Sequence, residues 1–443
     1  MTAPTARRFP PLTAPRRRAT PLPPPAARVD QPLNPVLRWT FVLLVFSIPF
    51  ELPERSFAIE IPTITASVFL LATLLQPRAC YARRPTALLW FVIYLYAFVV
   101  AAAWNGRNAV ATDLNNASYW GQVGKLFLLI LQGVLVFWAA YNLLASRPVA
   151  RTALLTLAGA CLARALLPLL GIARTTHVIW GGGTRVTAFG QNANNSAMIL
   201  AAGFIALLGL QYGAERALPP VRPRWLAWPA IALLGVSVVD TGSRGGLVAL
   251  VAGLVTFMFG STRSLWVSVR NAVVAAVAIG LIIVASYQSD VMRRRFEETV
   301  ESGNLAGRER IYPALWAMFQ ERPLLGWGPV NNKYELGIRL DERIFRRRDA
   351  HNLVLEALSS TGLAGTIPFC AGLGLCVLGA WRARRGRHGS LPFALAAVVL
   401  MNNMSGNWIA SKLLWLVLAY GLASLAYRAG PDPPPDPQLR RGR

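Results

Sequence analysis

Long apolar segments recur along this chain, and short clusters of arginine and glycine separate them. Runs of roughly 17–25 apolar residues match the length that an α-helix needs to cross a bilayer. The segments lack the alternation of apolar and polar residues that marks the strands of a membrane barrel. The pattern predicts an all-α, polytopic membrane protein of about 12 transmembrane helices, with spans near residues 37–51, 59–76, 86–104, 119–142, 150–171, 193–213, 225–240, 244–260, 270–287, 363–380, 391–408 and 411–427.

One connecting loop is much longer than the others, and it has room for a small folded unit outside the bilayer. Both ends of the chain are rich in proline and arginine, a composition typical of disordered tails. The chain therefore divides into a basic tail (1–36), spans one to nine (37–287), the long loop (288–362), spans ten to twelve (363–427) and a second tail (428–443).

The distribution of arginine predicts the orientation of the spans. An even number of spans places both tails on the same side of the membrane. The short loops on that side carry more lysine and arginine than the opposite ones, whose arginines are Arg55, Arg107, Arg174, Arg185 and Arg244. Because short cytoplasmic loops are enriched in these residues, we expect cytoplasmic tails and an extracytoplasmic long loop.

Two helices are predicted within the long loop. The first covers residues 308–321, and the second covers residues 352–360, before Gly362 and Gly365 interrupt the path into the tenth span. The apolar face of the first helix, at helical spacing, consists of Ile311, Leu315, Met318 and Phe319.

The composition agrees with a membrane protein, since 54% of the residues are hydrophobic and only 15% are charged. The net charge of +25 would suggest nucleic acid as the partner of a soluble protein. In a membrane protein it indicates contacts with anionic lipid headgroups instead. The four cysteines and the acidic residues show no metal-ligand spacing, so we expect neither a metal nor a cofactor.

Several basic residues lie toward the outer side of the predicted spans, against the positive-inside bias. Each one alone could extend its charged end to the membrane interface. Together they predict a basic cavity for an anionic headgroup, because guanidinium groups bind phosphate through paired hydrogen bonds. These residues are Lys125, Arg164, Arg174, Arg185, Arg244, Arg308, Arg310 and Lys412.

Two polar segments on the outer side are candidates for phosphate or sugar binding. Residues 185–195 form an amide-rich stretch with Asn192 and Asn194, although a helix N-cap is an equally good explanation. Residues 240–246 place three glycines around Arg244, so that backbone N–H groups can approach a phosphate. A plain turn between two spans is the alternative for this second segment.

A third segment runs from Gly307 to Gly365 and contains Arg308, His351 and Asn352. His351 is the only histidine of the long loop, and it lies where the chain returns to the membrane. Its imidazole suits proton transfer near neutral pH. A structural role is the alternative for a single histidine.

The chain resembles the O-antigen ligase and polymerase superfamily over roughly residues 180–366. The resemblance rests on the order of several motifs rather than on any single motif. In chain order they are Arg185 with Phe189-Gly-Gln-Asn-Ala-Asn194, then Thr241-Gly-Ser-Arg-Gly245, Gly307-Arg308, Arg322-Pro-Leu-Leu-Gly-Trp-Gly328, His351-Asn352 and Gly362-Leu-Ala-Gly365.

The resemblance implies a C-type glycosyltransferase at the periplasmic face of a bacterial inner membrane. Such an enzyme transfers a glycan from undecaprenyl diphosphate to an acceptor hydroxyl without a nucleotide sugar. A single dominant outer loop resembles the ligases of this superfamily, whose acceptor is lipid A–core. The implied partners are therefore the lipid-linked glycan, lipid A–core and the bilayer, with no nucleic acid.

These residues suggest a metal-independent, inverting displacement at the anomeric carbon. Arg244 and Arg308 would stabilise the charge that develops on the departing diphosphate, and His351 would orient or deprotonate the acceptor hydroxyl. The residues expected to bind diphosphate or sugar around them are Arg185, Asn192, Asn194, Arg310, Asn352, Lys125 and Arg164.

Other functions remain open at this level. An O-antigen polymerase would use the same chemistry with a glycan as the acceptor. A secondary transporter would carry ionisable groups near the middle of the bilayer and internal repeats, and the sequence shows neither. A flippase for the same lipid is a further alternative.

Overall fold

The computed structural model describes residues 32–51, 60–108, 118–178, 184–212, 224–260, 265–303, 307–341, 347–386 and 388–428. The predicted tails lie outside these residues, except for residues 32–36 and 428. The α-helices are α1 (Pro35–Ser47), α2 (Ile61–Thr73), α3 (Pro77–Tyr81), α4 (Leu88–Asn105), α5 (Tyr119–Leu144), α6 (Arg147–Leu169), α7 (Ala193–Tyr212), α8 (Ala227–Asp240), α9 (Arg244–Phe259), α10 (Leu265–Gln288), α11 (Asp290–Ser302), α12 (Arg308–Glu321), α13 (Asn331–Arg339), α14 (Leu353–Ala383), α15 (Leu391–Asn403) and α16 (Lys412–Ala423). The short 3-10 helices are η1 (Ile48–Phe50), η2 (Gly106–Asn108), η3 (Arg224–Leu226) and η4 (Ser424–Arg428), and the strands are β1 (Arg174–Val178) and β2 (Thr184–Ala188).

Each predicted span coincides with an apolar helix. Within the described ranges, six helices are long and apolar enough to cross a membrane, namely α4, α5, α6, α7, α10 and α14. The other predicted spans correspond to shorter apolar helices, namely α1, α2, α8, α9, α15 and α16. These helices indicate a polytopic membrane protein.

Helices α7 and α10 differ in how much of their surface the other helices cover. Nearly all residues of α7 are buried, and it contacts α6, α8, α9 and α15. Helix α10 is also apolar, yet only Ala275 and Ser286 of its residues are buried. An apolar helix that protein does not cover is suited to contact with lipid acyl chains.

An aromatic cluster joins α4, α5 and α16. The fully buried Trp415 packs edge-on against Phe91, with ring centroids 5.0 Å apart, and also against Phe137. Its indole lies directly on Gly133 of α5, where a Cβ atom would overlap the ring. Small residues that let neighbouring helices approach in this way are typical of membrane bundles.

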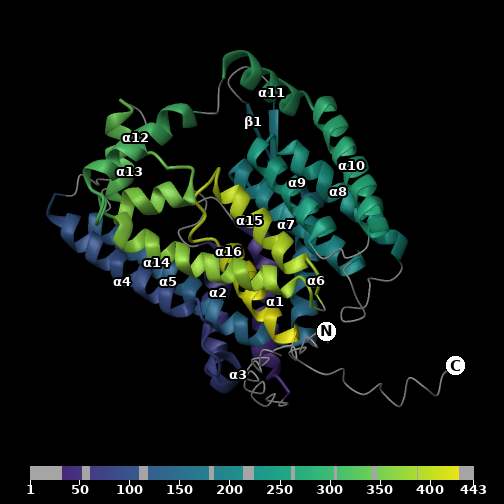
Figure 1. Cartoon of the computed structure of the whole chain (residues 1–443), viewed down its shortest axis with the longest axis horizontal. Helices are drawn as coiled ribbons and strands as arrows, with labels where there is room; N and C mark the ends of the chain where they lie inside the picture. The colour runs from purple at the N-terminus through teal and green to yellow at the C-terminus, as the bar shows by residue number, and fades with distance from the viewer. Residues whose placement is uncertain are drawn as a thin grey trace, which may run out of the picture. The chain divides into compact units, whose positions relative to one another are not determined.

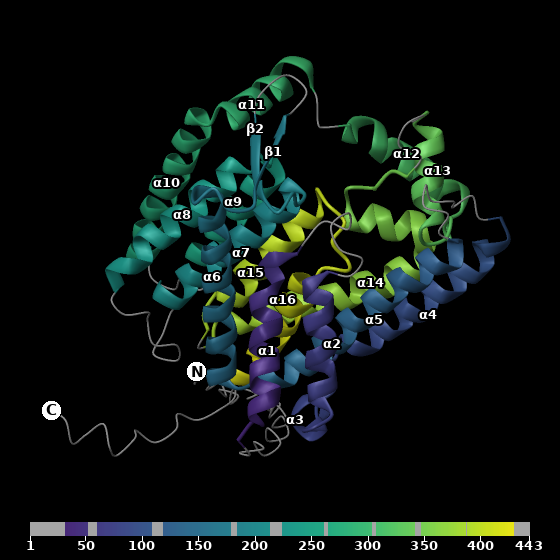
Figure 2. The ribbon, with the colours of Figure 1, turned by 180° about the vertical axis from the view of Figure 1, so that it is seen from behind.

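Strands β1 and β2 form an antiparallel hairpin between α6 and α7, with His177 opposite Arg185. The described residues otherwise form helices, as the predicted all-α class requires, but this hairpin was not predicted. The segments Arg-Thr-Thr-His-Val and Thr-Arg-Val-Thr-Ala are rich in β-branched residues, which favour strands. Figure 2 shows this hairpin and helices α11, α12 and α13 at one end of the long helices, with α3 at the opposite end.

The long loop contains three helices, α11 to α13, of which only α12 was predicted. The predicted bounds of α12 are confirmed, and so are three residues of its apolar face, because Ile311, Leu315 and Met318 are buried. They pack with Leu336 and Leu340 in a small core of their own. Helices α11 and α13 were missed because most of their residues are polar, so neither stands out from the loop as an apolar segment.

The segment of residues 323–328 fills a break in α14. At Gly362 the backbone has φ 58° and ψ −158°, which interrupts the helical hydrogen bonds. The loop replaces them: Leu363 N–H donates to the Pro323 carbonyl at 2.8 Å, and Trp327 N–H donates to the Ser359 carbonyl at 2.8 Å. The predicted interruption at Gly362 is confirmed, and the break holds the long loop on the bundle.

We expect Gly362→Ala to destabilise the protein strongly. An added Cβ would overlap the backbone of Leu324 and Leu325, and a positive φ is unfavourable for alanine. The backbone conformation alone should lower the free energy of unfolding by about 1–3 kcal/mol. Thermal unfolding in detergent measures this effect. Gly374→Ala is the control in the same helix, because nothing lies within 4 Å of a Cβ there.

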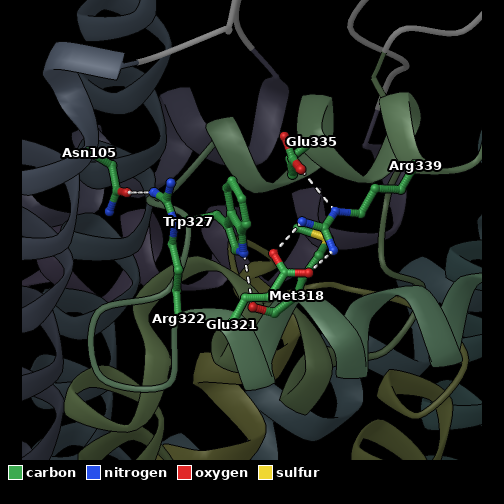
Figure 3. A network of polar contacts seen from close by, with 7 residues as sticks. All are labelled: Asn105, Met318, Glu321, Arg322, Trp327, Glu335 and Arg339. Atoms are coloured by element: carbon green, nitrogen blue, oxygen red, sulfur yellow. Dashed lines mark hydrogen bonds and ion pairs between the residues drawn. The ribbon is translucent and has the colours of Figure 1, made fainter.

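A cluster around Trp327 connects α12 and α13 to α4 through Arg322. Figure 3 shows its indole between two guanidinium groups: Arg322 lies 3.8 Å and Arg339 lies 4.9 Å from a Trp327 ring centroid. Arg322 also donates to Asn105 Oδ1 of α4 at 2.8 Å, and Arg339 forms ion pairs with Glu321 and Glu335. Stacking and ion pairing together fix the orientation of α12 relative to α13.

Candidate active site

The N-termini of α7, α9, α12 and α14 meet near the loop that joins α15 to α16. Ser243, the N-cap of α9, donates to Asn194 Oδ1 in the first turn of α7 at 2.7 Å. The carbonyls of Met404 and Ser405, in the α15–α16 loop, accept hydrogen bonds from residues at the starts of α12 and α14. Several helix N-termini at one place favour the binding of an anion.

Arg308 holds the central position in this arrangement. It is the first residue of α12, and its Nη2 atom donates to the Ser405 carbonyl at 3.0 Å. Arg308 acts electrostatically on both Arg244 and His351. The fold thus brings the three residues predicted to be catalytic together around the start of α12.

Arg244 is fixed by α11. Its Nη1 atom donates to the Arg295 carbonyl at 3.0 Å and to the Thr299 hydroxyl. Burial lowers the pKa of Arg295, and Arg308 lowers it further while Glu298 opposes both effects. Glu298 and Glu309 also act on Arg244. The cluster of Arg244, Arg295 and Arg308 is therefore cationic but partly balanced by carboxylates at its edge.

His351 lies in the tight turn that leads into α14. Its backbone has φ 50°, in the left-handed region that histidine and asparagine tolerate better than most residues. The Tyr312 hydroxyl donates to the His351 carbonyl at 3.2 Å and to the Met404 carbonyl at 2.9 Å. These contacts hold the turn against the α15–α16 loop.

The charges around His351 favour the neutral imidazole. Burial lowers the pKa of His351, and Arg308, Arg348 and Lys333 lower it further, whereas Asp349 opposes them. Lys333 and Asp349 form an ion pair at 2.6 Å, which holds the pKa of Asp349 at about 2. Burial of Lys333 works against its charge, but the carboxylates of Asp349 and Glu356 together outweigh this effect and raise the lysine pKa.

Arg185 and Asn194 border this cluster. The Arg185 Nη2 atom donates to the Gly242 carbonyl at 3.3 Å, which ties strand β2 to the turn before α9. Gly242 has φ 62°, and an added Cβ would overlap Val291. The exposed Asn192 caps α7, because its Oδ1 atom accepts from Asn194 N–H. The N-cap interpretation of this amide-rich segment is therefore confirmed for Asn192.

Residues 229–370 match the family model described as O-antigen ligase. The chain therefore carries an O-antigen ligase domain. A search of curated proteins finds no match. The domain begins in α8 and ends in α14, so it contains all of Arg244, Arg308 and His351.

The other five predicted binding residues have contacts of different kinds. Arg310 of the O-antigen ligase domain donates to the Leu340 carbonyl at 3.2 Å, toward α13. Asn352 caps α14 and makes a long contact with the Met404 carbonyl at 3.5 Å. Lys125 is exposed on α5, and Arg164 is buried against Gln191 and Ser196. The fifth is Asn192, the cap of α7.

Sequence reasoning missed three contributors to the arrangement around the O-antigen ligase domain. Arg295 was hidden in the charged segment Arg293-Arg-Arg295 of α11. Tyr312 and Ser405 contribute through contacts that join distant parts of the chain. Among the described residues, no three His, Cys, Asp or Glu side chains gather as a metal site would require.

Proposed function

We propose that this protein is an O-antigen ligase that transfers a glycan from undecaprenyl diphosphate to a sugar hydroxyl of lipid A–core. The observation that carries the proposal is the position of Arg308, which acts on Arg244 and on His351 at the meeting point of several helix N-termini. A cationic site beside a neutral imidazole is suited to a reaction in which a diphosphate leaves and a hydroxyl attacks.

In this mechanism the acceptor oxygen forms a bond to the anomeric carbon while the bond from that carbon to the diphosphate oxygen breaks. The configuration at the carbon inverts. Arg244 and Arg308 stabilise the negative charge on the departing lipid diphosphate. His351 takes the proton of the acceptor hydroxyl. Arg185 and Asn194 orient the glycan or the diphosphate from the side of β2 and α7.

The proposed topology places this site at the periplasmic face of the inner membrane. Twelve spans would put both tails in the cytoplasm, and the hairpin and α11–α13 lie at one end of the helices. The ligase reaction is favoured over the polymerase reaction because the chain has one long outer loop and a short one between α6 and α7.

Reconstitution in liposomes tests the proposed function. The purified protein is supplied with lipid-linked glycan and with lipid A–core, in the presence and absence of a chelator. We expect glycan to appear on lipid A–core, with undecaprenyl diphosphate as the second product, and no loss of rate with the chelator. Extension of the lipid-linked glycan alone would show a polymerase, and no transfer at all would contradict both reactions.

The pH dependence should report the charges around His351. Because a base must be neutral, kcat/KM should fall as the pH falls through the pKa of His351, which lies below its ordinary value of 6.5. Lys333→Gln removes a nearby positive charge and leaves Asp349 without its ion-pair partner. Both changes raise the pKa of His351, so the acid limb should move to higher pH.

The control for this profile is Arg293→Gln, which removes an exposed charge that pairs with Asp290 on α11. Rates are measured from pH 5 to pH 8 for the parent and both variants. An unchanged acid limb in Lys333→Gln would show that His351 does not supply the titrating group.

A further inference from the structure

A cavity of about 180 Å³ lies beside the candidate active site, under the hairpin. Helices α6, α7 and α8, strand β2 and the first residue of strand β1 form its walls. It is separate from the arginine cluster but adjoins it, since Asp240 and Thr241 line the cavity just before the turn that carries Arg244. The polar side chains that line it are Arg164, Arg174, Thr187, Ser196, Ser237, Asp240 and Thr241.

Two of the polar residues that line the cavity are deeply buried and incompletely hydrogen-bonded. Arg164 and Thr187 are each only 2% exposed. The Nη2 atom of Arg164 is held by Gln191 and Ser196, both at 2.6 Å, but its Nε atom has no partner among the described residues. The Thr187 hydroxyl likewise has none. Because buried polar groups are normally hydrogen-bonded, both side chains can still gain a polar partner.

The charges of the cavity do not match those of a phosphate site. The Asp240 carboxylate offsets the positive charge of Arg174, and the Glu51 side chain interacts favourably with the charge of Arg164. The other polar groups of the lining are hydrogen-bond donors and acceptors, among them several hydroxyls. The apolar part of the lining includes Pro168, Leu169 and Val186. A lining of this kind suits a sugar ring, which has hydroxyl groups at its edge and apolar C–H faces.

The size of the cavity limits its ligand to a single ring. Typical small-molecule pockets enclose roughly 300–1,000 Å³, so 180 Å³ leaves no room for an oligosaccharide. We propose that this cavity is a sugar subsite, which binds one ring of a glycan substrate through Thr187, Arg164 and Asp240. This inference rests on the proposed glycosyl transfer. The ring belongs either to the donor glycan or to the acceptor core, and both sources share this chemistry.

Kinetics with two variants test the subsite. Thr187→Val removes the hydroxyl with little change of shape, and Ser237→Leu fills the cavity from α8. We expect Thr187→Val to raise the KM of one substrate by about two- to tenfold, the effect of one lost hydrogen bond, with kcat within twofold. Ser237→Leu should raise the same KM further. Varying the donor at saturating acceptor, and then the acceptor at saturating donor, shows which substrate supplies the ring.

Thr176→Val is the matched control, because Thr176 is exposed on strand β1 and does not line the cavity. Its KM values should equal those of the parent. An equal rise in Thr176→Val would assign the effect to the fold of the hairpin and overturn the proposal. Unchanged KM values for both substrates in Thr187→Val and Ser237→Leu would overturn it too.

A binding measurement separates failure of the subsite from failure of the proposed function. Saturation-transfer NMR in detergent is recorded with methyl glycosides of glucose, galactose and N-acetylglucosamine. We expect at least one to bind the parent and Thr176→Val but not Ser237→Leu, even if no transfer is found in the liposomes. Binding of none of them, or equal binding to Ser237→Leu, would show that the cavity holds water only.

Discussion

His351→Asn is expected to lower kcat by about 10²–10⁴, the usual contribution of a positioned general base. Asparagine tolerates the left-handed backbone of this position, so the turn into α14 should persist while proton transfer is lost. Single-turnover transfer from lipid-linked glycan to lipid A–core measures the rate, with both substrates saturating. Equal thermal unfolding of the parent and the variant shows that the fold is intact.

Tyr312→Phe is the control for this experiment. It removes the hydroxyl that binds the His351 and Met404 carbonyls but leaves the imidazole in place. We expect it to cost less than tenfold in kcat, because one hydrogen bond contributes about 0.5–1.5 kcal/mol. Full activity of His351→Asn would end the assigned role of the imidazole. A larger loss in Tyr312→Phe than in His351→Asn would assign the effect to the position of the turn.

The helices of the bundle were predictable because a segment that crosses a membrane must be long and apolar. Backbone polar groups in a bilayer must pair within the segment, so long apolar runs have to be helices. Outside the membrane this requirement does not apply, so the length of an apolar run does not predict the helices of the long loop. Helix α13 has nine residues and is held by the stacking of Trp327 with Arg322 and Arg339, and such contacts leave no periodic pattern in the sequence.

The motif Pro323-Leu-Leu-Gly-Trp-Gly328 shows how chemistry and structure can be confused in a sequence. It was read as part of a segment that carries the reaction. In the structure its backbone pairs with α14 on both sides of Gly362, and Gly326 lies against the Ser359 and Gly362 backbones. The motif fixes the long loop on the bundle and thereby positions Arg308 and His351. A sequence alone does not separate these two roles, since both require particular residues in a particular order.

The order of the motifs led us to predict one site for Arg244, Arg308 and His351. It did not predict the contacts that hold these side chains in place. Arg308 is held by the carbonyl of Ser405, almost a hundred residues later. Arg244 is held by α11, a helix in which most residues are polar. Contacts to backbone carbonyls leave no mark on residue type at the accepting position, so no pattern could have identified them.

Arg308→Ala should lower kcat/KM by about 10²–10³, the typical cost of removing one preorganised contact to developing charge. Arg308→Lys should recover only part of this loss, because an ammonium group lacks the planar fork that matches a phosphate. Arg310→Ala is the comparison, and we expect it to stay within about threefold of the parent. Two residues apart on a helix project about 200° from each other, and Arg310 accordingly contacts Leu340 and α13 rather than Ser405.

The two arginines share a helix and a charge but project in different directions, so the comparison separates the position of the charge from its presence. Transfer rates are measured at several concentrations of the lipid-linked donor, since a group that binds the departing diphosphate affects kcat as well as KM. Equal losses in Arg308→Ala and Arg310→Ala would mean that the charge of α12 as a whole attracts the donor. A loss confined to Arg308 would place the diphosphate between the starts of α9 and α12, where Arg244 faces it from the other side.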